Sequence, residues 1–186
     1  MYKHFFKRIF DCLFALILLI PLLPIMLLIA IAIKLDSKGP AIFKQVRSGK
    51  DNKEFMLYKF RSMTANNDFY DKSKEDQLTK VGAFIRKTSL DELPQLMNIL
   101  KGDMSLVGPR PCTEREYELY TERDKLRLKV PQGLTGEWQV RGRSDTSFKS
   151  MVDMDLDYIQ NKRGFWYDIG ILFRTIPAFL FRKGAR

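Results

Sequence analysis

The sequence predicts a mainly helical α+β protein in two parts, a membrane helix over residues 1–35 and a small mixed domain over residues 36–186. An uncharged apolar run covers residues 12–33, which makes 22 residues, long enough to cross a bilayer core. Apolar and polar residues alternate over residues 41–47 and 54–60 on either side of a glycine turn, which predicts a β-hairpin. Helical spacing of apolar residues dominates much of the remaining chain.

The composition limits the chemistry that the chain can carry out. Its 186 residues have a net charge of +10, which favours an anionic partner such as lipid headgroups, nucleic acid or phosphorylated substrates. Cys12 and Cys112 are far apart, so a disulfide framework is not expected and a reducing compartment fits. The single histidine, His4, lies at the terminus and excludes His-based catalysis or a His/Cys zinc site. Chemistry then depends on carboxylates, Lys and Arg, hydroxyls and a hard metal ion such as Mg²⁺.

The apolar run is predicted to be a membrane helix and not a cleaved signal peptide, because it is too long and no small-residue cleavage site follows it. Pro21 and Pro24 lie at its centre, where each removes a helix hydrogen bond and favours a kink. Basic residues flank the run on both sides, and basic flanks tend to stay in the cytoplasm. From the residues alone two outcomes are open: a simple crossing, which is the common one, and a helix that bends at the prolines and returns to the same face.

Two adjacent acids, Asp91 and Glu92, stand at the start of a short apolar helix. Ser89 and Glu92 have the spacing of a capping box, although Asp91 itself could be the cap. A row of apolar residues at helical spacing is expected to face a core: Leu93, Leu96, Met97 and Leu100. The two acids are either ordinary first-turn residues that suit the helix dipole, or part of a site for phosphate and metal.

Basic residues near the acid pair are candidates for binding phosphate. Arg86 lies just upstream. Lys59 and Arg61 are two residues apart, so in a strand both would point to one face, which either grips a phosphate or is solvated. Arg110 lies in a Gly-Pro-Arg-Pro run, whose prolines restrict the backbone. That restriction would hold the guanidinium for bidentate phosphate recognition, unless the run is only a structural turn.

A glycine-rich loop over residues 131–143 is a further candidate for binding. Its three glycines would allow the backbone to approach a ligand closely, and Arg143 adds charge. The glycine spacing matches neither a P-loop nor a dinucleotide-binding fingerprint. We therefore expect close backbone contact here without claiming either motif.

Charged helices are predicted over residues 113–129 and 147–162. Asp155 lies in the second of these, either on a solvated face or in contact with the basic loops. Residues 164–182 are rich in aromatic side chains, and the segment is too short and too interrupted to cross a bilayer. It is expected to be an amphipathic helix in the membrane interface, with a core helix as the alternative.

Several of these motifs, in this order, resemble those of the bacterial sugar transferases. These are small monotopic phosphoglycosyl transferases that start glycan assembly on polyprenol phosphate. Besides the early membrane segment, the resemblance rests on four runs: Lys59-Phe60-Arg61-Ser62-Met63, Ser89-Leu90-Asp91-Glu92-Leu93-Pro94-Gln95, Gly102-Asp103-Met104-Ser105-Leu106-Val107-Gly108-Pro109-Arg110-Pro111, and Gly133-Leu134-Thr135-Gly136 continuing to Gly142-Arg143. It covers nearly the whole chain.

The resemblance implies a Mg²⁺-dependent transfer in two steps, with Asp91 as the nucleophile and a metal-binding residue. Asp91 would attack the β-phosphate of a UDP-sugar, UMP would leave, and polyprenol (undecaprenyl) phosphate would then take the phosphosugar from the aspartate. Glu92 would act as a base toward the lipid phosphate or orient the metal. The candidate substrate contacts are Lys59, Arg61, Arg86, Arg110, Arg143 and Asp155.

The resemblance also implies a location and a topology. The helix would be re-entrant, broken at Pro21 and Pro24, on the cytoplasmic face of the bacterial inner membrane, and this replaces simple crossing as our expectation. The break differs from the usual Ser-Pro pair, because Leu23 precedes Pro24 and Pro21 is extra. Without the serine hydroxyl, a carbonyl freed at the bend lacks one hydrogen-bond donor.

The expected partners are a UDP-sugar, polyprenol phosphate and membrane lipids, and not nucleic acid. The reaction would be the first membrane step in making a capsule, O-antigen, exopolysaccharide or glycoprotein. The sugar and the oligomeric state, including a homo-oligomer, stay open. The alternative function is a membrane-anchored, non-catalytic binder of anionic polymer or an assembly partner, which would bind in a salt-sensitive manner and release no UMP.

Overall fold

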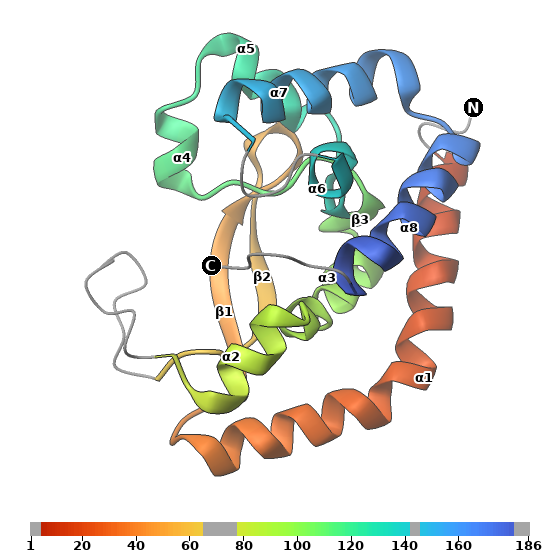
Figure 1. Cartoon of the computed structure of the whole chain (residues 1–186). Helices are drawn as coiled ribbons and strands as arrows, with labels where there is room; N and C mark the ends of the chain where they lie inside the picture. Colours follow the sequence, from red (N-terminus) through yellow and green to blue (C-terminus); the bar gives the residue numbers. More distant parts are fainter. Residues whose placement is uncertain (1–4, 65–77, 142–145, 181–186) are drawn as a thin grey trace.

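The computed structural model describes residues 5–64, 78–141 and 146–180, which form a mainly helical α+β protein with small sheets (Figure 1). In chain order the elements are α1 (Lys7–Asp36), β1 (Ile42–Ser48), η2 (Lys50–Asn52), β2 (Glu54–Phe60), α2 (Lys80–Lys87), η4 (Leu90–Glu92), α3 (Gln95–Lys101), β3 (Met104–Val107), α4 (Glu114–Glu118), α5 (Glu122–Lys125), η5 (Leu126–Lys129), β4 (Gln132–Thr135), α6 (Glu137–Arg141), α7 (Phe148–Asp157), η7 (Tyr158–Lys162) and α8 (Phe165–Leu180). The η elements are 3₁₀ turns, except η7, which is a π-helical turn. This confirms the predicted class.

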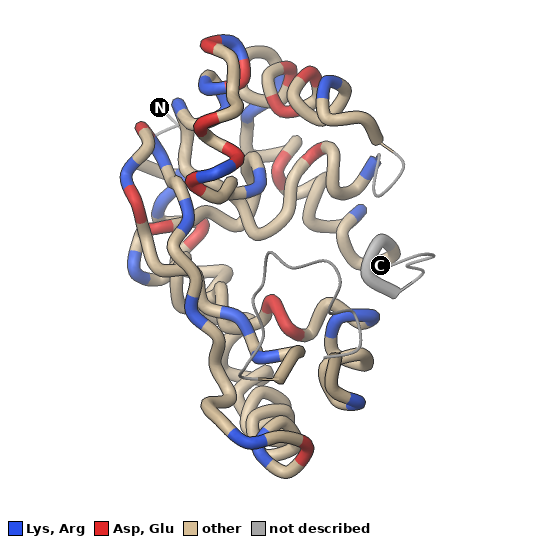
Figure 2. Tube along the Cα trace, turned by 90° about the vertical axis from the view of Figure 1, so that its left-hand side faces the viewer, with Lys and Arg blue, Asp and Glu red and all other residues tan. Residues whose placement is uncertain are grey.

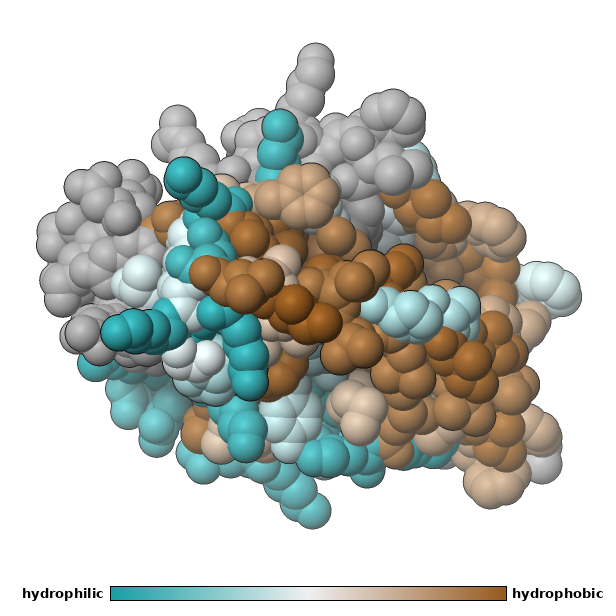
Figure 3. Space-filling model, turned by 90° about the horizontal axis from the view of Figure 1, so that it is seen from below, coloured by the Kyte–Doolittle hydropathy of each residue, from teal (hydrophilic) through white to brown (hydrophobic). Residues whose placement is uncertain are grey.

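The long apolar helix α1 bends between two arms (Figure 1). Pro21 and Pro24 lie inside it, and each removes a backbone donor from the helix ladder. Within the described part of the chain, α1 is the one helix long and apolar enough to cross a membrane. Its outward side chains are large and apolar; Leu27 and Leu28, for example, are 63% and 67% exposed. Seen from below, apolar side chains gather on the side of the molecule where α1 bends (Figure 3), as suits contact with lipid.

The inner face of α1 belongs to the core of the protein. Phe10, Ala15 and Leu19 in the first arm are buried in one cluster with residues of α3 and β3. Ile29 and Ile33 in the second arm are buried in another cluster with β2 and α2. The domain boundary predicted after residue 35 therefore coincides with the end of a helix that is packed against the rest of the chain along its length.

A buried ion cluster fastens the start of α1 to α8. Lys7 Nζ lies 2.8 Å from Asp11 Oδ1 and 3.1 Å from Asp168 Oδ2. Asp168 also accepts a hydrogen bond from the Tyr158 hydroxyl at 2.7 Å, and Asp11 accepts one from the Ser105 hydroxyl at 2.7 Å. These bonds compensate two carboxylates that share one lysine in a water-poor environment.

The predicted hairpin is confirmed. Strands β1 and β2 pair antiparallel, with Ile42 opposite Phe60 and Ser48 opposite Glu54. The turn between them contains two residues with left-handed backbone, Asp51 and Asn52, a conformation that Asp and Asn tolerate well.

The second sheet corrects the predicted loop over residues 131–143. Strand β4 pairs in parallel with β3, with Met104 opposite Gln132. Two of the glycines bring the chain close to itself: a Cβ on Gly133 would lie 2.2 Å from Gly108 N, and one on Gly136 would lie 2.4 Å from Gly108 O. Close backbone contact was thus the right expectation, but its partner is the Gly-Pro-Arg-Pro segment.

The helix predicted over residues 113–129 is divided into α4, α5 and η5. The reason is a second helix start at Thr121, which forms a capping box with Asp124 just as Thr113 does with Glu116. Acidic and basic residues are interspersed over this upper part of the molecule, around α4, α5 and α7 (Figure 2).

Helix α8 carries apolar residues on two sides. Ile171 is fully buried, whereas Trp166 and Phe173 are 81% and 69% exposed. One side of the helix therefore packs in the core and another presents aromatic side chains outward. The location of residues 164–182 in the membrane interface stays a prediction.

Candidate active site

Asp91 and Glu92 lie on η4, a single turn between α2 and α3. The predicted capping box is wrong: Ser89 has a left-handed backbone (φ +56°) and its side chain caps nothing, while its carbonyl accepts the Glu92 N–H at 3.2 Å. The helix α3 begins only after Pro94 and ends, as predicted, at Gly102, whose φ is +100°. Of the apolar row, Leu96 is buried, but Met97 is 42% exposed, because the 3₁₀ turn shifts the helical face.

Glu92 joins two of the predicted basic residues. Its Oε1 atom lies 3.2 Å from Lys59 Nζ of β2 and 3.1 Å from Arg110 Nη2. Burial alone would raise the pKa of Glu92, but the charges and hydrogen bonds of Arg110 and Lys59 outweigh it and lower the pKa to about 2. Glu92 is therefore a fixed anion at neutral pH.

Asp91 has a different environment, although it is the next residue. Within the described part of the chain it makes no hydrogen bond or ion pair. Burial raises its pKa, the charge of Glu92 raises it further, and Lys59, Arg86 and Arg110 offset part of the rise. The two carboxylates thus differ: one is held by cations, and the other has oxygens available for a ligand.

A cavity of about 550 Å³ lies beside Asp91. Strands β1 and β2, the segment after β2 and the helix α2 supply its walls. Its wall is apolar in part and basic in part, with Phe43, Phe60 and Met63 among the former and Lys44, Lys59, Arg61 and Arg86 among the latter. Its size is in the usual range for a small-molecule site, and its charge suits an anion.

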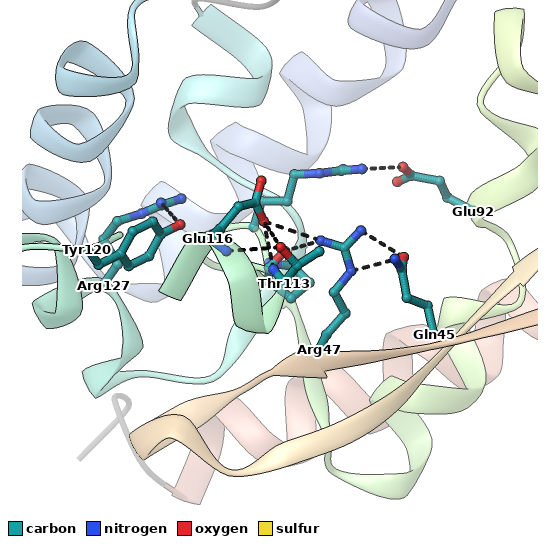
Figure 4. A network of polar contacts seen from close by, with 9 residues as sticks. Gln45, Arg47, Glu92, Thr113, Glu116, Tyr120 and Arg127 are labelled. Atoms are coloured by element: carbon teal, nitrogen blue, oxygen red, sulfur yellow. Dashed lines mark hydrogen bonds and ion pairs between the residues drawn. The ribbon is translucent and has the colours of Figure 1, made fainter. Parts of the chain in front are cut away.

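The Gly-Pro-Arg-Pro segment is held from both sides, which explains the placement of Arg110. On one side, the Gly108 N–H donates to Thr135 O at 2.9 Å and the Gly133 N–H donates to Pro109 O at 2.7 Å. On the other side, Arg47 of β1 contacts Pro111 O at 3.4 Å and Glu116 Oε2 at 3.6 Å. Figure 4 shows the contacts of Arg47 with Gln45 and Glu116, and Glu92 nearby. The rigidity predicted for this segment is supported by these bonds.

Arg47 and Lys44 are site residues that the sequence reasoning missed. Arg47 also donates to Gln45 Oε1 at 2.8 Å, and the two residues lie two apart on one face of β1. The sequence signal that could have linked Arg47 to Gln45 is the alternation of side chains in a strand, which places residues two apart on one face.

Arg61 and Lys59 bind different groups: Lys59 pairs with Glu92, whereas Arg61 binds backbone carbonyls. Strand β2 ends at Phe60, so the alternation that would align the two cations stops there. The Arg61 guanidinium donates to Lys38 O at 2.6 Å and to Ser37 O at 2.7 Å, beyond the end of α1. A cation at a helix C-terminus is stabilised by the free carbonyls. Arg61 thus lines the cavity while it fastens α1 to the hairpin.

Asp155 is not brought to the acid pair. It is 1% exposed and its Oδ2 atom lies 2.7 Å from Arg127 Nη2, in an ion pair between α7 and η5. Burial raises its pKa to about 6, although Arg127 opposes the shift. Asp155 thus forms a buried ion pair within the fold, and its contact with the substrate stays a prediction. Arg143 lies outside the described residues.

The site fits Mg²⁺ only with help from a ligand. Among the described residues no three His, Cys, Asp or Glu side chains gather in a way that could hold a metal. Mg²⁺ is, however, commonly bound by one or two carboxylates together with phosphate oxygens of a substrate. Asp91, with its unpaired carboxylate beside the cavity, suits that arrangement.

Comparison with known proteins identifies the family. A family model described as bacterial sugar transferase matches residues 2–182. The chain belongs to the bacterial sugar transferase family. A relative in Bacillus subtilis, the uncharacterized sugar transferase EpsL, is 43% identical over 96% of this chain and 89% of its own length.

Longer members of the sugar transferase family are also similar. The undecaprenyl-phosphate galactose phosphotransferase of Salmonella typhimurium is 43% identical over 98% of this chain and 42% of that protein. The UDP-glucose:undecaprenyl-phosphate glucose-1-phosphate transferase of Klebsiella pneumoniae is 43% identical over 97% of this chain and 41% of that protein. The chain thus spans less than half the length of these two relatives.

Proposed function

We propose that this chain transfers a sugar 1-phosphate from a UDP-sugar to undecaprenyl phosphate, with release of UMP, as an early step in polysaccharide synthesis. The names of the Salmonella and Klebsiella relatives support the substrate class. The observation that carries the proposal is the division of labour in the acid pair. Glu92 is fixed by Lys59 and Arg110, while Asp91 is unpaired beside a basic cavity.

Asp91 is the nucleophile in this proposal. One of its carboxylate oxygens attacks the β-phosphorus of the UDP-sugar, and the bond from that phosphorus to the bridging oxygen breaks, so that UMP leaves with the bridging oxygen. An oxygen of undecaprenyl phosphate then attacks the same phosphorus and frees the Asp91 carboxylate. Two transfers of the sugar phosphate, first to Asp91 and then to the lipid phosphate, replace one direct transfer between the two anionic substrates.

The basic residues make an attack by one anion on another feasible. Lys59, Arg86 and Arg110 surround Asp91 and lower the repulsion that a carboxylate would meet at a diphosphate. Glu92, with a pKa of about 2, is too weak a base to take a proton near neutral pH. We therefore assign it neither the base role nor the metal-orienting role that the resemblance implied, but the role of holding Lys59 and Arg110 in place.

Bound Mg²⁺ would neutralise diphosphate charge and stabilise the leaving phosphate. Asp91 is the residue placed to hold it, alongside the phosphate oxygens of the UDP-sugar. Lys59, which lines the same cavity as Asp91, and Arg110 would offset the charge of the same phosphates.

The bend in α1 supports a re-entrant topology in which both ends of the helix lie on the cytoplasmic face of the membrane. Arg61 ties the end of α1 to the strand that carries Lys59. This contact fixes the position of the lipid-facing helix relative to the site, so that an undecaprenyl phosphate held in the bilayer can reach Asp91.

The test is UMP release by the purified chain in lipid nanodiscs, with Mg²⁺, undecaprenyl phosphate and a panel of UDP-sugars. At least one UDP-sugar should give turnover in the parent, and Asp91→Asn should lower it by about 10³-fold or more because the nucleophile is lost. The matched control is Asp153→Asn, which removes an exposed carboxylate paired with Arg123 and should leave turnover unchanged. Turnover of Asp91→Asn near the parent rate would contradict the assignment.

A further inference from the structure

A second cavity lies at the start of α1. Its volume is about 230 Å³, and it shares no lining residue with the cavity beside Asp91. Five of its nine lining residues are basic and one is acidic. The basic ones are Lys7, Arg8, Lys50, Lys129 and Arg163, and the acidic one is Asp11. They come from separate segments of the chain, and folding alone brings them together.

Lys7 adds no net positive charge to the cavity, because it is already paired with Asp11 and Asp168. Arg8 is different. Its guanidinium donates to the carbonyls of Ile99 and Leu100 at the end of α3, which hold it in place without neutralising it. Gly102 leaves room for it, since a Cβ there would lie 3.3 Å from Arg8 Nη2. No carboxylate among the described residues forms an ion pair with Arg8, which is thus a fixed cation at the wall of the cavity.

The outer cations also leave positive charge in excess. Lys50 and Lys129 share one exposed carboxylate, Asp51, at 3.9 and 3.6 Å, and exposed pairs at such distances are weak. Within the described part of the chain Arg163 has no ion-pair partner. A hollow with several under-compensated cations favours an anion with multiple acceptor oxygens, such as a phosphate group.

The surroundings of the cavity indicate where such a phosphate would come from. Phe5 and Ile9 lie on either side of Lys7 and Arg8 in the sequence and are 68% and 48% exposed. On another side, Arg163 is followed closely by Trp166, which is 81% exposed. The ring of Phe165 packs 5.3 Å from that of Phe10, so the starts of α1 and α8, which carry the two apolar edges, lie side by side. Cations next to exposed aromatic and aliphatic side chains are typical of the level of lipid headgroups.

We propose that this cavity binds the headgroup phosphate of an anionic phospholipid, with the acyl chains against the apolar edges at Phe5, Ile9 and Trp166. Arg8 and Arg163 contact the phosphate, and Lys50 and Lys129 supply the outer charge. The bound lipid fixes the start of α1 at the bilayer surface. The inference rests on membrane association alone and does not require the proposed transferase chemistry.

The test is native mass spectrometry of the full chain released from nanodiscs of phosphatidylcholine with phosphatidylglycerol. We expect the parent to retain one phosphatidylglycerol, and the double variant Lys129→Gln/Arg163→Gln to retain it several-fold less often. The matched control, Arg123→Gln/Lys149→Gln, removes the same charge from exposed positions outside the cavity and should retain lipid as the parent does. Equal retention in the parent and the cavity variant would overturn the proposal.

Two further arms separate the sources of the phosphate and the effects of folding. Inorganic phosphate added before release should not displace the lipid; full displacement would mean that the cavity takes free phosphate and would overturn the lipid assignment. Thermal unfolding of both double variants should stay close to that of the parent, and a cavity variant that is folded but lipid-free supports the proposal. A single variant, Arg163→Lys, keeps the charge of the cavity and should retain most of the lipid that the parent retains, in contrast to the double variant.

Discussion

Asp91 and Glu92 are adjacent, yet their surroundings push their pKa values in opposite directions. Lys59 and Arg110 lower the pKa of Glu92 to about 2, whereas burial and the charge of Glu92 raise that of Asp91. The nucleophile that we propose is thus the carboxylate whose protonation affects activity in an accessible pH range.

The pH dependence of UMP release should follow Asp91. Activity should fall as the pH drops through the pKa of Asp91, which lies above the ordinary value of 3.8. In Glu92→Gln a neighbouring negative charge is gone while Lys59 and Arg110 remain, so the pKa of Asp91 falls. The acid limb of kcat/KM should then move to lower pH, with a lower plateau. An acid limb at the same pH in parent and variant would count against Asp91 as the titrating group.

The thermal stability of Glu92→Gln, compared with that of the parent, should also depend on pH in a predictable direction. The pKa of Glu92 is lowered on folding from 4.5 to about 2, so its ionised form stabilises the native state above pH 4.5. This contribution, at most about 3 kcal/mol, is lost as the pH falls toward 2. The difference in thermal stability between parent and Glu92→Gln should therefore be largest near neutral pH and should shrink below pH 4.5.

Local sequence predicted the residues of the site better than their partners. The acid pair and Arg110 were found because the stiffness of a Gly-Pro-Arg-Pro run is a property of a few neighbouring residues. The ion pair of Asp155 could not be predicted, because its partner, Arg127, lies in a different element and charge spacing does not identify it. The direction of the Arg61 side chain could not be predicted from strand alternation, because β2 ends one residue earlier, at Phe60.

Among the elements, the segment that carries Arg110 depends on two neighbours. Strand β4 holds it through backbone hydrogen bonds, and β1 holds it through Arg47. The parallel pairing of β3 with β4 was not predicted, because strands of four residues far apart in the chain leave no periodic signal. The hairpin was predicted because both strands and their turn are contiguous.

Arg47→Met should weaken the support of Arg110 without touching the substrate directly. The contacts to Pro111 O and Glu116 would be lost, and Arg110 would be less well placed on Glu92. We expect kcat to fall about tenfold, since a small misplacement of a catalytic group is costly, with little change in KM. Arg47→Lys should recover only part of the rate, because Lys lacks the planar guanidinium. As a control, Arg123→Met removes an exposed arginine paired with Asp153 and should have no such effect; a loss of rate in the control equal to that in Arg47→Met would refute a specific support.

At the scale of the whole molecule, the elements after α1 pack against the inner faces of both arms of that helix. A helix that crossed the bilayer in a straight line could not pack both arms against the same domain on one side of the membrane. This packing favours the re-entrant topology, which the apolar composition of residues 12–33 does not distinguish from a simple crossing.

The topology can be tested in intact cells. Tyr2→Cys and Lys38→Cys, each on a Cys12→Ser background, place a thiol before and after α1. Both thiols should be shielded from an impermeant reagent added outside and should become reactive once the inner membrane is permeabilised. Labelling of position 2 alone in intact cells would show that α1 crosses the membrane and would rule out re-entry.

The most direct measurement for the central claim is the mass of the protein after incubation with a UDP-sugar and Mg²⁺ in the absence of undecaprenyl phosphate. The account predicts an added sugar phosphate, mapped by peptide fragmentation to Asp91, lost on later addition of undecaprenyl phosphate and absent from Asp91→Asn. An active enzyme that never carries this adduct, or carries it on another residue, would contradict the assignment of Asp91 as the nucleophile.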